Sequence, residues 1–450
     1  MSETLLSITP IDGRYKNRVS ELNDIFSEYG MIRRRVDVEI EYFIFLSTFI
    51  PELSGVNTDH VSKLRDISKN FNLEEAEVVK KIEERTRHDV KAVEYYLRLK
   101  FEDLEISEYV PFIHFGLTSQ DINSVVYVTQ LWDFRSTVYS DSIHKILNIM
   151  GDLGKLYEDI PMLSRTHGQA ATPTTVGKEF LVYYERLSNQ YEYLRKMNFK
   201  TKFGGAVGRL NAHHVAYPSI EWHSKMDDFI AHYSYRRGFM MGRHRYTTQI
   251  DHYENYAVVF DIIKRINSIL IDFCVDMWMY ISMDYFKMRV VEGEIGSSAM
   301  PHKVNPIMFE NAEGNLHIAN TLLNFLSTRL PTSRLQRDLT DSTILRNMGT
   351  TFAHTILSYK NIICGLERVT LDKDVVREDL ESNPVVIAEA IQTILRSKGY
   401  SNAYEMVKSY VRSNKHIDET GLRDFIRKLE VDNVLKNRLL TLSPINYIGI

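Results

Sequence analysis

The chain has little cysteine: 450 residues contain only two, Cys274 and Cys364, and they lie far apart in the sequence. This number excludes a fold stapled by disulfide bonds. Each cysteine falls within an apolar helical pattern, without a neighbour that would activate a thiolate. We therefore predict two reduced core residues.

Long hydrophobic runs and a surplus of positive charge are also missing. The longest apolar stretch, residues 43–50, is much shorter than the roughly 20 residues of a membrane span, and MSETLLSITP does not resemble a signal peptide. We expect a cytoplasmic protein with no membrane partner. The formal net charge of −4 provides no positive field for a nucleic-acid partner, so any phosphate recognition must be local.

Several motifs of nucleotide and metal chemistry are absent. The sequence lacks a GxxxxGK[ST] loop, a GxGxxG segment after a strand, a CxxC pair and an HExxH motif. His213, His214 and His223 do not have the spacing of a zinc site. The sequence thus gives no support to nucleotide hydrolysis or hydride transfer, and we predict neither a metal site nor a cofactor.

Helical periodicity dominates the sequence, and strand signals are sparse. Apolar residues recur with helical spacing over residues 143–160, 180–194, 256–281 and 343–366. These segments are longer than the mean helix of about 11–12 residues, which predicts an all-α fold with a long central helical bundle.

Three helical domains are expected: residues 1–110, the central bundle at 111–364, and residues 365–450, where Pro384 opens a helix and Gly399 closes it. The segment 256–281 is apolar on nearly all sides, so we do not expect a single subunit to bury it. This predicts a homo-oligomer that shares the bundle. A self-contained core helix is the alternative.

Three polar segments interrupt the helices. Residues 293–306, GEIGSSAMPHKVNP, have the composition of a flexible anion-binding loop, with a helix opened by Pro306, or of a plain connection. His167 lies in a predicted loop, SRTHGQ, as a general acid or base or as a structural hydrogen-bonding group. Thr118 and Asp121 have the spacing of a helix capping box.

Three charged segments are ambiguous from spacing alone. Residues 80–91, which include Arg87, His88 and Asp89, favour one solvated helix face with internal ion pairs. Residues 334–346 place three arginines beside Ser342 and Thr343, as a phosphate site requires. Four arginines between residues 236 and 245, without an acidic residue, favour an exposed basic loop.

The segment GSSAMPHKVNP resembles the signature loop of the fumarase/aspartase superfamily, and its His302 is similar to the adenylosuccinate lyase branch, in the bacterial long form. The resemblance extends through PIDGRY, RHDVKAVEYY, HFGLTSQDIN, SRTHGQAATPTTVGKE, GAVG, YTTQI, QRDLTDSTILRN and NYIG. It implies a homotetramer of three-domain, all-α chains that removes fumarate, without a cofactor, from adenylosuccinate and from succinyl-aminoimidazole carboxamide ribotide (SAICAR) in purine biosynthesis.

The resemblance also implies catalytic roles. Ser297 is expected to be the general base and His167 the general acid of an anti elimination. His88 resembles a second active-site histidine, Lys303 is expected to stabilise negative charge, and Glu310 resembles a carboxylate that orients His167.

A larger set is expected to bind the nucleotide and the succinyl group, in active sites that draw on three chains. Its members are Arg14, Tyr15, Arg87, His88, Asp89, Thr118, Ser119, Gln249, Ser298, Lys303, Val304, Asn305, Asn311, Arg337, Ser342, Thr343 and Arg346. Arg87 departs from the family pattern, because relatives more often have a small polar residue there. Another fumarate-releasing lyase and a non-catalytic helical scaffold are the competing interpretations.

Overall fold

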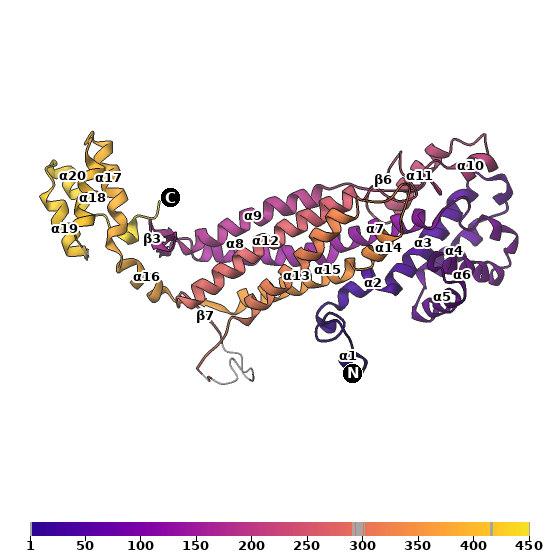
Figure 1. Ribbon diagram of the computed structural model, residues 1–450, viewed down its shortest axis with the longest axis horizontal. Helices are drawn as coiled ribbons and strands as arrows, with labels where there is room; N and C mark the ends of the chain where they lie inside the picture. Colours follow the sequence, from indigo (N-terminus) through magenta and orange to yellow (C-terminus); the bar gives the residue numbers. More distant parts are fainter. Residues whose placement is uncertain (1, 290–292, 294–299, 301, 415–416, 450) are drawn as a thin grey trace. The chain divides into compact units, whose positions relative to one another are not determined.

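The chain is mainly α-helical, and the computed structural model describes residues 2–289, 293, 300, 302–414 and 417–449 (Figure 1). The first elements along the chain are α1 (Ser2–Leu5), η1 (Lys16–Arg18), η2 (Ser20–Leu22), α2 (Asn23–Phe26), α3 (Glu28–Ser47), η3 (Pro51–Leu53), α4 (Thr58–Lys69), α5 (Leu73–Thr86), α6 (Asp89–Asp103), η4 (Ser107–Phe112), α7 (Ser119–Phe134), η5 (Arg135–Tyr139) and α8 (Ser140–Leu156).

The middle of the chain combines short strands with long helices. Its elements are β1 (Pro161–Met162), β2 (Arg165–Thr166), β3 (Gln169–Ala170), β4 (Thr174–Thr175), α9 (Val176–Lys196), β5 (Phe199–Thr201), α10 (Asn211–Ala216), α11 (Trp222–Arg236), β6 (Met241–Arg243), α12 (Glu254–Ser282), β7 (Phe286–Met288) and α13 (Ile307–Arg329). The remaining elements are α14 (Thr340–Leu345), α15 (Met348–Arg368), β8 (Val369–Leu371), α16 (Lys373–Glu381), η6 (Pro384–Ile387), α17 (Ala388–Ser397), α18 (Ala403–Ser413), α19 (Glu419–Lys428), α20 (Asn433–Leu440) and η7 (Pro444–Asn446).

The long helices lie where the apolar periodicity predicts them. Helices α8, α9 and α12 correspond to three of the four predicted segments, and α12 has 29 residues. The fourth predicted helix, 343–366, is divided: α14 ends at Leu345 and α15 starts at Met348. Helix α13 starts at Ile307, directly after Pro306, as the proline predicts.

Two compact units make up the chain. The first contains residues 1–143, 190–268 and 314–359, and the second contains residues 144–189, 269–313 and 360–450. The long helices α12 and α13 belong in part to each unit. The predicted division into three domains, with boundaries near residues 110 and 364, stays a prediction.

Helix α3 is the centre of the first unit. Most of its residues are buried, including Arg34, Arg35 and Glu39. Because burying a charge is costly unless it is paired, α3 requires partners from its neighbours. Nearby, Phe134 of α7 stacks on Phe352 of α15, with ring centroids 4.2 Å apart.

Aromatic contacts hold together the helices of the second unit. Tyr183 of α9 contacts Phe273 of α12 at 5.2 Å between ring centroids, and Phe273 contacts Phe309 of α13 at 6.1 Å. Helices α17 to α20 have an apolar core of their own, formed by Ile387, Ile391, Leu395, Ala403, Val407, Leu422, Ile426, Leu429, Leu435 and Leu439.

Short strand pairs join the helices. In the described residues β1 pairs with β4, β2 with β3 and β7 with β8 in antiparallel fashion, whereas β5 and β6 are parallel. The predicted loop is a β2–β3 hairpin, and His167 lies in its turn. Two-residue strands are too short to leave an alternating pattern in the sequence.

Large apolar side chains stay exposed on the long helices. Helix α12 exposes Val275, Trp278 and Met279, at 36%, 45% and 51%, and α13 exposes Ile318 and Phe325. This agrees with the expectation that one chain does not bury these helices. Across the described part of the chain, no helix combines the length and apolar character needed to cross a membrane.

Candidate active site

A tight turn between α5 and α6 places His88. Arg87 has a left-handed backbone, with φ of 53°, and ends α5. His88 is the N-cap of α6, where its Nδ1 accepts a hydrogen bond from the Lys91 amide at 3.1 Å. Its Nε2 lies 3.5 Å from the Ser119 hydroxyl oxygen. The interpretation of residues 80–91 as one solvated helix face is therefore wrong, because the helix breaks at Arg87.

Asp89 is held between two arginines. Its Oδ2 accepts hydrogen bonds from Arg35 at 2.8 Å and from Arg346 at 3.2 Å. Burial favours the neutral carboxyl group of Asp89, but the charge of Arg35 and the hydrogen bonds outweigh it, so the pKa of Asp89 lies below its ordinary value. The buried Arg35 also donates to Asn123 Oδ1 at 2.9 Å. Asp89 is thus an ionised link between α3, α6 and the end of α14.

The start of α7 is fixed by a buried carboxylate. Asp121 Oδ2 accepts from the Thr118 amide at 2.8 Å, as the capping box predicts, and Asp121 Oδ1 lies 2.6 Å from Lys202 Nζ. The amides of Gly204 and Gly205 donate to the same carboxylate. This arrangement fixes the first turn of α7, which presents Ser119.

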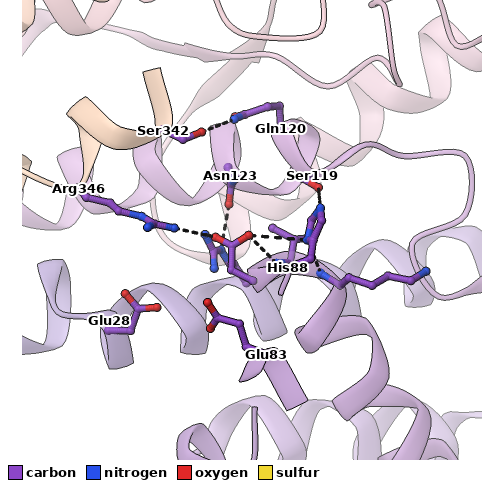
Figure 2. Close-up of polar contacts among 12 residues, drawn as sticks. Glu28, Glu83, His88, Ser119, Gln120, Asn123, Ser342 and Arg346 are labelled. Atoms are coloured by element: carbon purple, nitrogen blue, oxygen red, sulfur yellow. Dashed lines mark hydrogen bonds and ion pairs between the residues drawn. The ribbon is translucent and has the colours of Figure 1, made fainter. Parts of the chain in front are cut away.

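Ser342 lies in the first turn of α14 and has two donors. Gln120 Nε2 and Arg337 Nη2 lie 3.1 Å and 3.2 Å from its hydroxyl oxygen. Arg337 also donates to Gln249 Oε1 at 3.2 Å, so residues from three separate segments of the sequence meet here. Figure 2 shows Arg346, Asn123, Ser119 and His88 directed toward one another, with Gln120 and Ser342 beside them.

The first unit therefore brings together many of the predicted nucleotide-binding residues: His88, Asp89, Thr118, Ser119, Gln249, Arg337, Ser342 and Arg346. Arg87 is exposed in the turn, and Thr343 is exposed on α14. Arg14 and Tyr15 precede η1, with the guanidinium of Arg14 6.0 Å from the ring of Tyr15.

Three residues of this cluster were not singled out from the sequence: Arg35, Gln120 and Asn123. A signal existed for Arg35, because an arginine in a helix with buried faces requires a polar partner. Two further carboxylates, Glu28 and Glu83, lie near the cluster (Figure 2), and Lys80 pairs with both.

The second unit contains the predicted catalytic residues that the structure describes, apart from His88. His167 is exposed at the tip of the β2–β3 hairpin and has a left-handed backbone, with φ of 53°. Lys303, Val304 and Asn305 precede α13. Ser297 and Ser298 lie outside the described residues.

Glu310 and Asn311 lie near the start of α13. Glu310 Oε1 accepts a hydrogen bond from the Trp278 indole at 3.1 Å, and Asn311 accepts one from Asn361. The predicted pairing of Glu310 with His167 is not tested by these contacts and stays a prediction.

The basic segment 236–245 is not the exposed loop that was expected. Arg236 pairs with Glu41, Arg237 pairs with Asp37 at 3.2 Å and with Asp133 at 3.3 Å, and the Arg243 side chain is only 1% exposed.

The acidic partners of this basic segment come from α3, α7 and α11, which is why the local sequence did not reveal them. Arg236 and Arg245 are exposed, as predicted, whereas Arg237 and Arg243 are half-buried. The segment therefore holds the first unit together.

The histidine group has a structural explanation. His213 is buried, and its Nε2 lies 2.9 Å from the Tyr42 hydroxyl. Burial lowers the pKa of His213 to about 4, so the ring is neutral at neutral pH. Within the described ranges, no cluster of three or more potential ligands is placed to hold a metal ion. Cys274 is buried, as predicted, and Cys364 is half-buried; both are free thiols.

Comparison with known proteins agrees with the sequence motifs. A family model described as "Lyase" matches residues 13–318, and one described as "Adenylosuccinate lyase C-terminal" matches residues 333–448. The chain is 49% identical to adenylosuccinate lyase of Dictyostelium discoideum over 99% of this chain and 97% of that protein. It is 41% identical to adenylosuccinate lyase of Escherichia coli K12, with the same coverage of both chains.

Solved structures share the fold at low sequence identity. A fumarate lyase from Mesorhizobium aligns with a TM-score of 0.72 and 18% identity, over 96% of this chain and 95% of that chain. The 3-carboxy-cis,cis-muconate lactonizing enzyme of Pseudomonas putida aligns with a TM-score of 0.71 and 19% identity, over 96% and 94%. By its full-length similarity and its helical fold, the chain belongs to the adenylosuccinate lyase family of the fumarase/aspartase superfamily.

Proposed function

We propose that the chain is a carbon–nitrogen lyase that converts adenylosuccinate to AMP and fumarate, and SAICAR to aminoimidazole carboxamide ribotide (AICAR) and fumarate. The observation that carries the proposal is the cluster around Asp89 and Ser342 in a chain 49% identical to a curated adenylosuccinate lyase. The cluster has cations and hydroxyl groups suited to a nucleotide phosphate, a substrate group that malate and aspartate lack.

Phosphate binding is assigned to the groups around Ser342. Arg337 and Arg346 supply charge-assisted donors, and the hydroxyls of Ser119 and Ser342 supply neutral ones. Arg346 is 55% exposed and pairs with Asp89 at 3.2 Å. The Arg346 guanidinium is therefore held in position by Asp89 but remains accessible to water and to a phosphate group.

The chemical step is an anti elimination. A base removes a proton from the succinyl β-carbon, the carbon–nitrogen bond breaks, and an acid protonates the departing nitrogen; the carbon skeleton leaves as fumarate. We assign the base to Ser297 and the acid to His167. The reaction is redox-neutral, so the proposal includes no cofactor.

A serine hydroxyl becomes a base only when the alkoxide is stabilised. We assign that task to backbone amides of the signature segment and to Lys303. Lys303 and Asn305 are also proposed to bind the carboxylate on which negative charge develops. Glu310 is proposed to orient His167, and His88 to orient the substrate or its phosphate.

We also propose a homotetramer with active sites that draw on three chains, and a cytoplasmic location. The exposed apolar side chains of α12 and α13 support an association through the long helices. The predicted binding residues His88, Ser119 and Ser342 lie in the first unit. The predicted catalytic residues His167, Lys303 and Glu310 lie in the second. Shared sites would bring these groups together from different chains.

A substrate panel tests the proposed function. Purified protein is incubated with adenylosuccinate, SAICAR, argininosuccinate, malate and aspartate, and fumarate is measured. We expect turnover of the first two only. Fumarate from malate, aspartate or argininosuccinate alone would favour another lyase of the superfamily, and no fumarate from any substrate would favour a helical scaffold.

The assignment of Ser297 is tested with the Ser297→Ala variant. We expect the variant to bind adenylosuccinate with nearly unchanged affinity and to lose at least about 100-fold in kcat, the lower range for loss of a proton-transfer group. A near-normal kcat would remove Ser297 from the role of base.

A further inference from the structure

His167 lies in the turn of the β2–β3 hairpin. His167 and Gly168 form the turn between β2 and β3 with φ of 53° and 73°, and both residues are exposed. The position of the imidazole ring therefore depends on what holds the base of the hairpin, residues 164–166 and 169–172.

Arg165 anchors one side of the base. Its Nη2 donates to Asp379 Oδ2 of α16 at 2.7 Å, and its Nη1 donates to the Tyr285 hydroxyl oxygen at 3.1 Å. The Tyr285 hydroxyl itself donates to Asp379. Burial and the hydrogen bond to Asp379 raise the pKa of Tyr285 to about 12, so Tyr285 stays a neutral donor. The three side chains form a closed set of hydrogen bonds.

The other side of the base is anchored by Thr172. Its hydroxyl donates to Glu389 Oε2 of α17 at 2.5 Å, and the Tyr447 hydroxyl donates to the same oxygen at 3.1 Å. Tyr447 belongs to the NYIG motif, for which neither the fold nor the proposed chemistry had given a reason. Glu389 is exposed, so this second anchor is the weaker of the two.

An apolar cluster lies at the same place. Leu163, directly before the hairpin, packs with Leu380 and Val386, which are 0% and 8% exposed, and Ile445 packs against all three as a group. Leu380 follows Asp379 in the chain, and Ile445 precedes Tyr447 by two residues. The polar anchors are therefore fixed in place by a buried contact between the hairpin and the C-terminal part of the second unit.

Asp379 also contacts the segment that leads to the signature loop. Tyr285 is 1% exposed, and its carbonyl oxygen accepts from the Asp372 amide at 2.9 Å. It directly precedes β7, after which the chain continues to residue 297. The Asp379 carboxylate thus accepts hydrogen bonds from Arg165 in the hairpin of the proposed acid and from Tyr285, directly before the strand that leads toward the proposed base.

We propose that Asp379 is a positioning residue for His167, and that Glu389 is a second, weaker one. The inference rests on the proposed function of His167 as the general acid. A misplacement of about 1 Å in a reacting group can cost about 100-fold in rate, and Asp379 fixes the hairpin without touching its tip. The C-terminal segment of the chain therefore belongs to the catalytic apparatus through these two carboxylates.

The kinetic test uses Asp379→Asn. This variant keeps the size of the side chain but loses the charge that holds Arg165. We expect kcat for adenylosuccinate to fall about 10- to 100-fold with KM changed less than about threefold, and Asp379→Glu to recover part of kcat. Glu381→Gln is the matched control, because Glu381 lies on the same helix and pairs with the exposed Arg377.

A double variant separates positioning from general damage. Arg165→Gln combined with Asp379→Asn is expected to lose no more activity than the more damaged single variant, because both substitutions remove one interaction. Glu389→Gln is expected to lose less activity than Asp379→Asn. Fully additive losses, or a normal kcat in Asp379→Asn, would overturn the proposal.

A second measurement does not depend on turnover. Hydrogen–deuterium exchange of the hairpin, residues 164–172, is expected to be faster in Asp379→Asn than in the wild type and in Glu381→Gln. Unchanged exchange contradicts the proposed anchor even if the wild type shows no lyase activity. An inactive wild type would instead reject the proposed function, and an active His167→Gln variant would reject the role of His167.

Discussion

Lys202 and Asp121 form an ion pair whose side chains are both 0% exposed, with 2.6 Å between Nζ and Oδ1. Burial lowers the pKa of Lys202, and the adjacent carboxylate only partly opposes that effect. Lys202 Nζ also donates to the Gly205 carbonyl oxygen, and the amides of Gly204 and Gly205 donate to the Asp121 carboxylate. At the scale of single residues, this buried charge links the start of α7 to a glycine-rich segment of the first unit.

Removal of one partner should be costly. We expect Lys202→Met to lose about 3–5 kcal/mol of stability, because Asp121 is left buried without its counter-charge. The double variant Lys202→Met/Asp121→Asn should lose less stability than Lys202→Met alone. Urea unfolding at a fixed protein concentration measures both, and a Lys202→Met protein as stable as the wild type would contradict the account.

A second buried pair should make stability depend on pH. His114 Nδ1 lies 2.6 Å from Glu39 Oε1, and the Glu39 side chain is 0% exposed. Burial opposes the charge on His114, but Glu39, followed by Glu94 and Asp121, raises the pKa of His114 above its ordinary value.

A raised histidine pKa means that the folded state holds the proton more tightly than the unfolded chain. The stabilisation is therefore complete below about pH 6.5 and is lost as the pH rises through the raised pKa, at about 1.4 kcal/mol for each pKa unit. We expect the stability advantage of the wild type over Glu39→Gln to shrink between pH 6 and pH 8.5. Glu108→Gln, an exposed carboxylate of η4, is the control. A constant difference would show that this pair does not titrate.

At the scale of elements, the sequence predicts a helix well where its apolar stripe is long. Helix α12 was predicted at 256–281 and spans Glu254–Ser282, because every turn contributes a buried apolar residue. The break between α5 and α6 could not be predicted this way. Arg87 is an ordinary helix former, and its left-handed conformation accompanies the cap of α6 by His88 and the tertiary contacts of His88 and Asp89.

The backbone at Arg87 gives a test of that break. A β-branched residue is strongly disfavoured at positive φ. We expect Arg87→Val to lower the free energy of unfolding by about 1–2 kcal/mol, the cost of a strained backbone residue. The free energy of unfolding of Arg87→Gly should stay within about 1 kcal/mol of the wild type. Arg85→Val, in the last turn of α5, should lose less than about 0.7 kcal/mol. Equal losses in the two valine variants would exclude backbone strain at Arg87.

The candidate site residues were singled out from the sequence on different grounds from the helices. Spacing alone left His88, Ser119 and Ser342 open to a structural interpretation, and the family motifs singled them out. The structure then brings the three into the cluster around Asp89. The arginines of residues 236–243 were misjudged because their acidic partners are distant in sequence, which a local pattern does not reveal.

At the scale of the whole molecule, the exposed apolar residues predict association. We expect light scattering to give the mass of four chains for the wild type. Phe325→Glu, which places a charge on a half-exposed apolar position of α13, should shift the protein to smaller species. Val434→Glu is the control, because Val434 is 82% exposed on α20 outside the long helices. A monomeric wild type would contradict the shared bundle.

We expect this chain to break a carbon–nitrogen bond of adenylosuccinate with its own side chains. The most direct measurement is the amount of AMP and fumarate that purified wild-type protein and His167→Gln form from adenylosuccinate, without added metal or cofactor. We expect equimolar AMP and fumarate from the wild type, and a kcat at least about 100-fold lower for His167→Gln. Failure of the wild type to form either product, or equal rates for the two proteins, would contradict it.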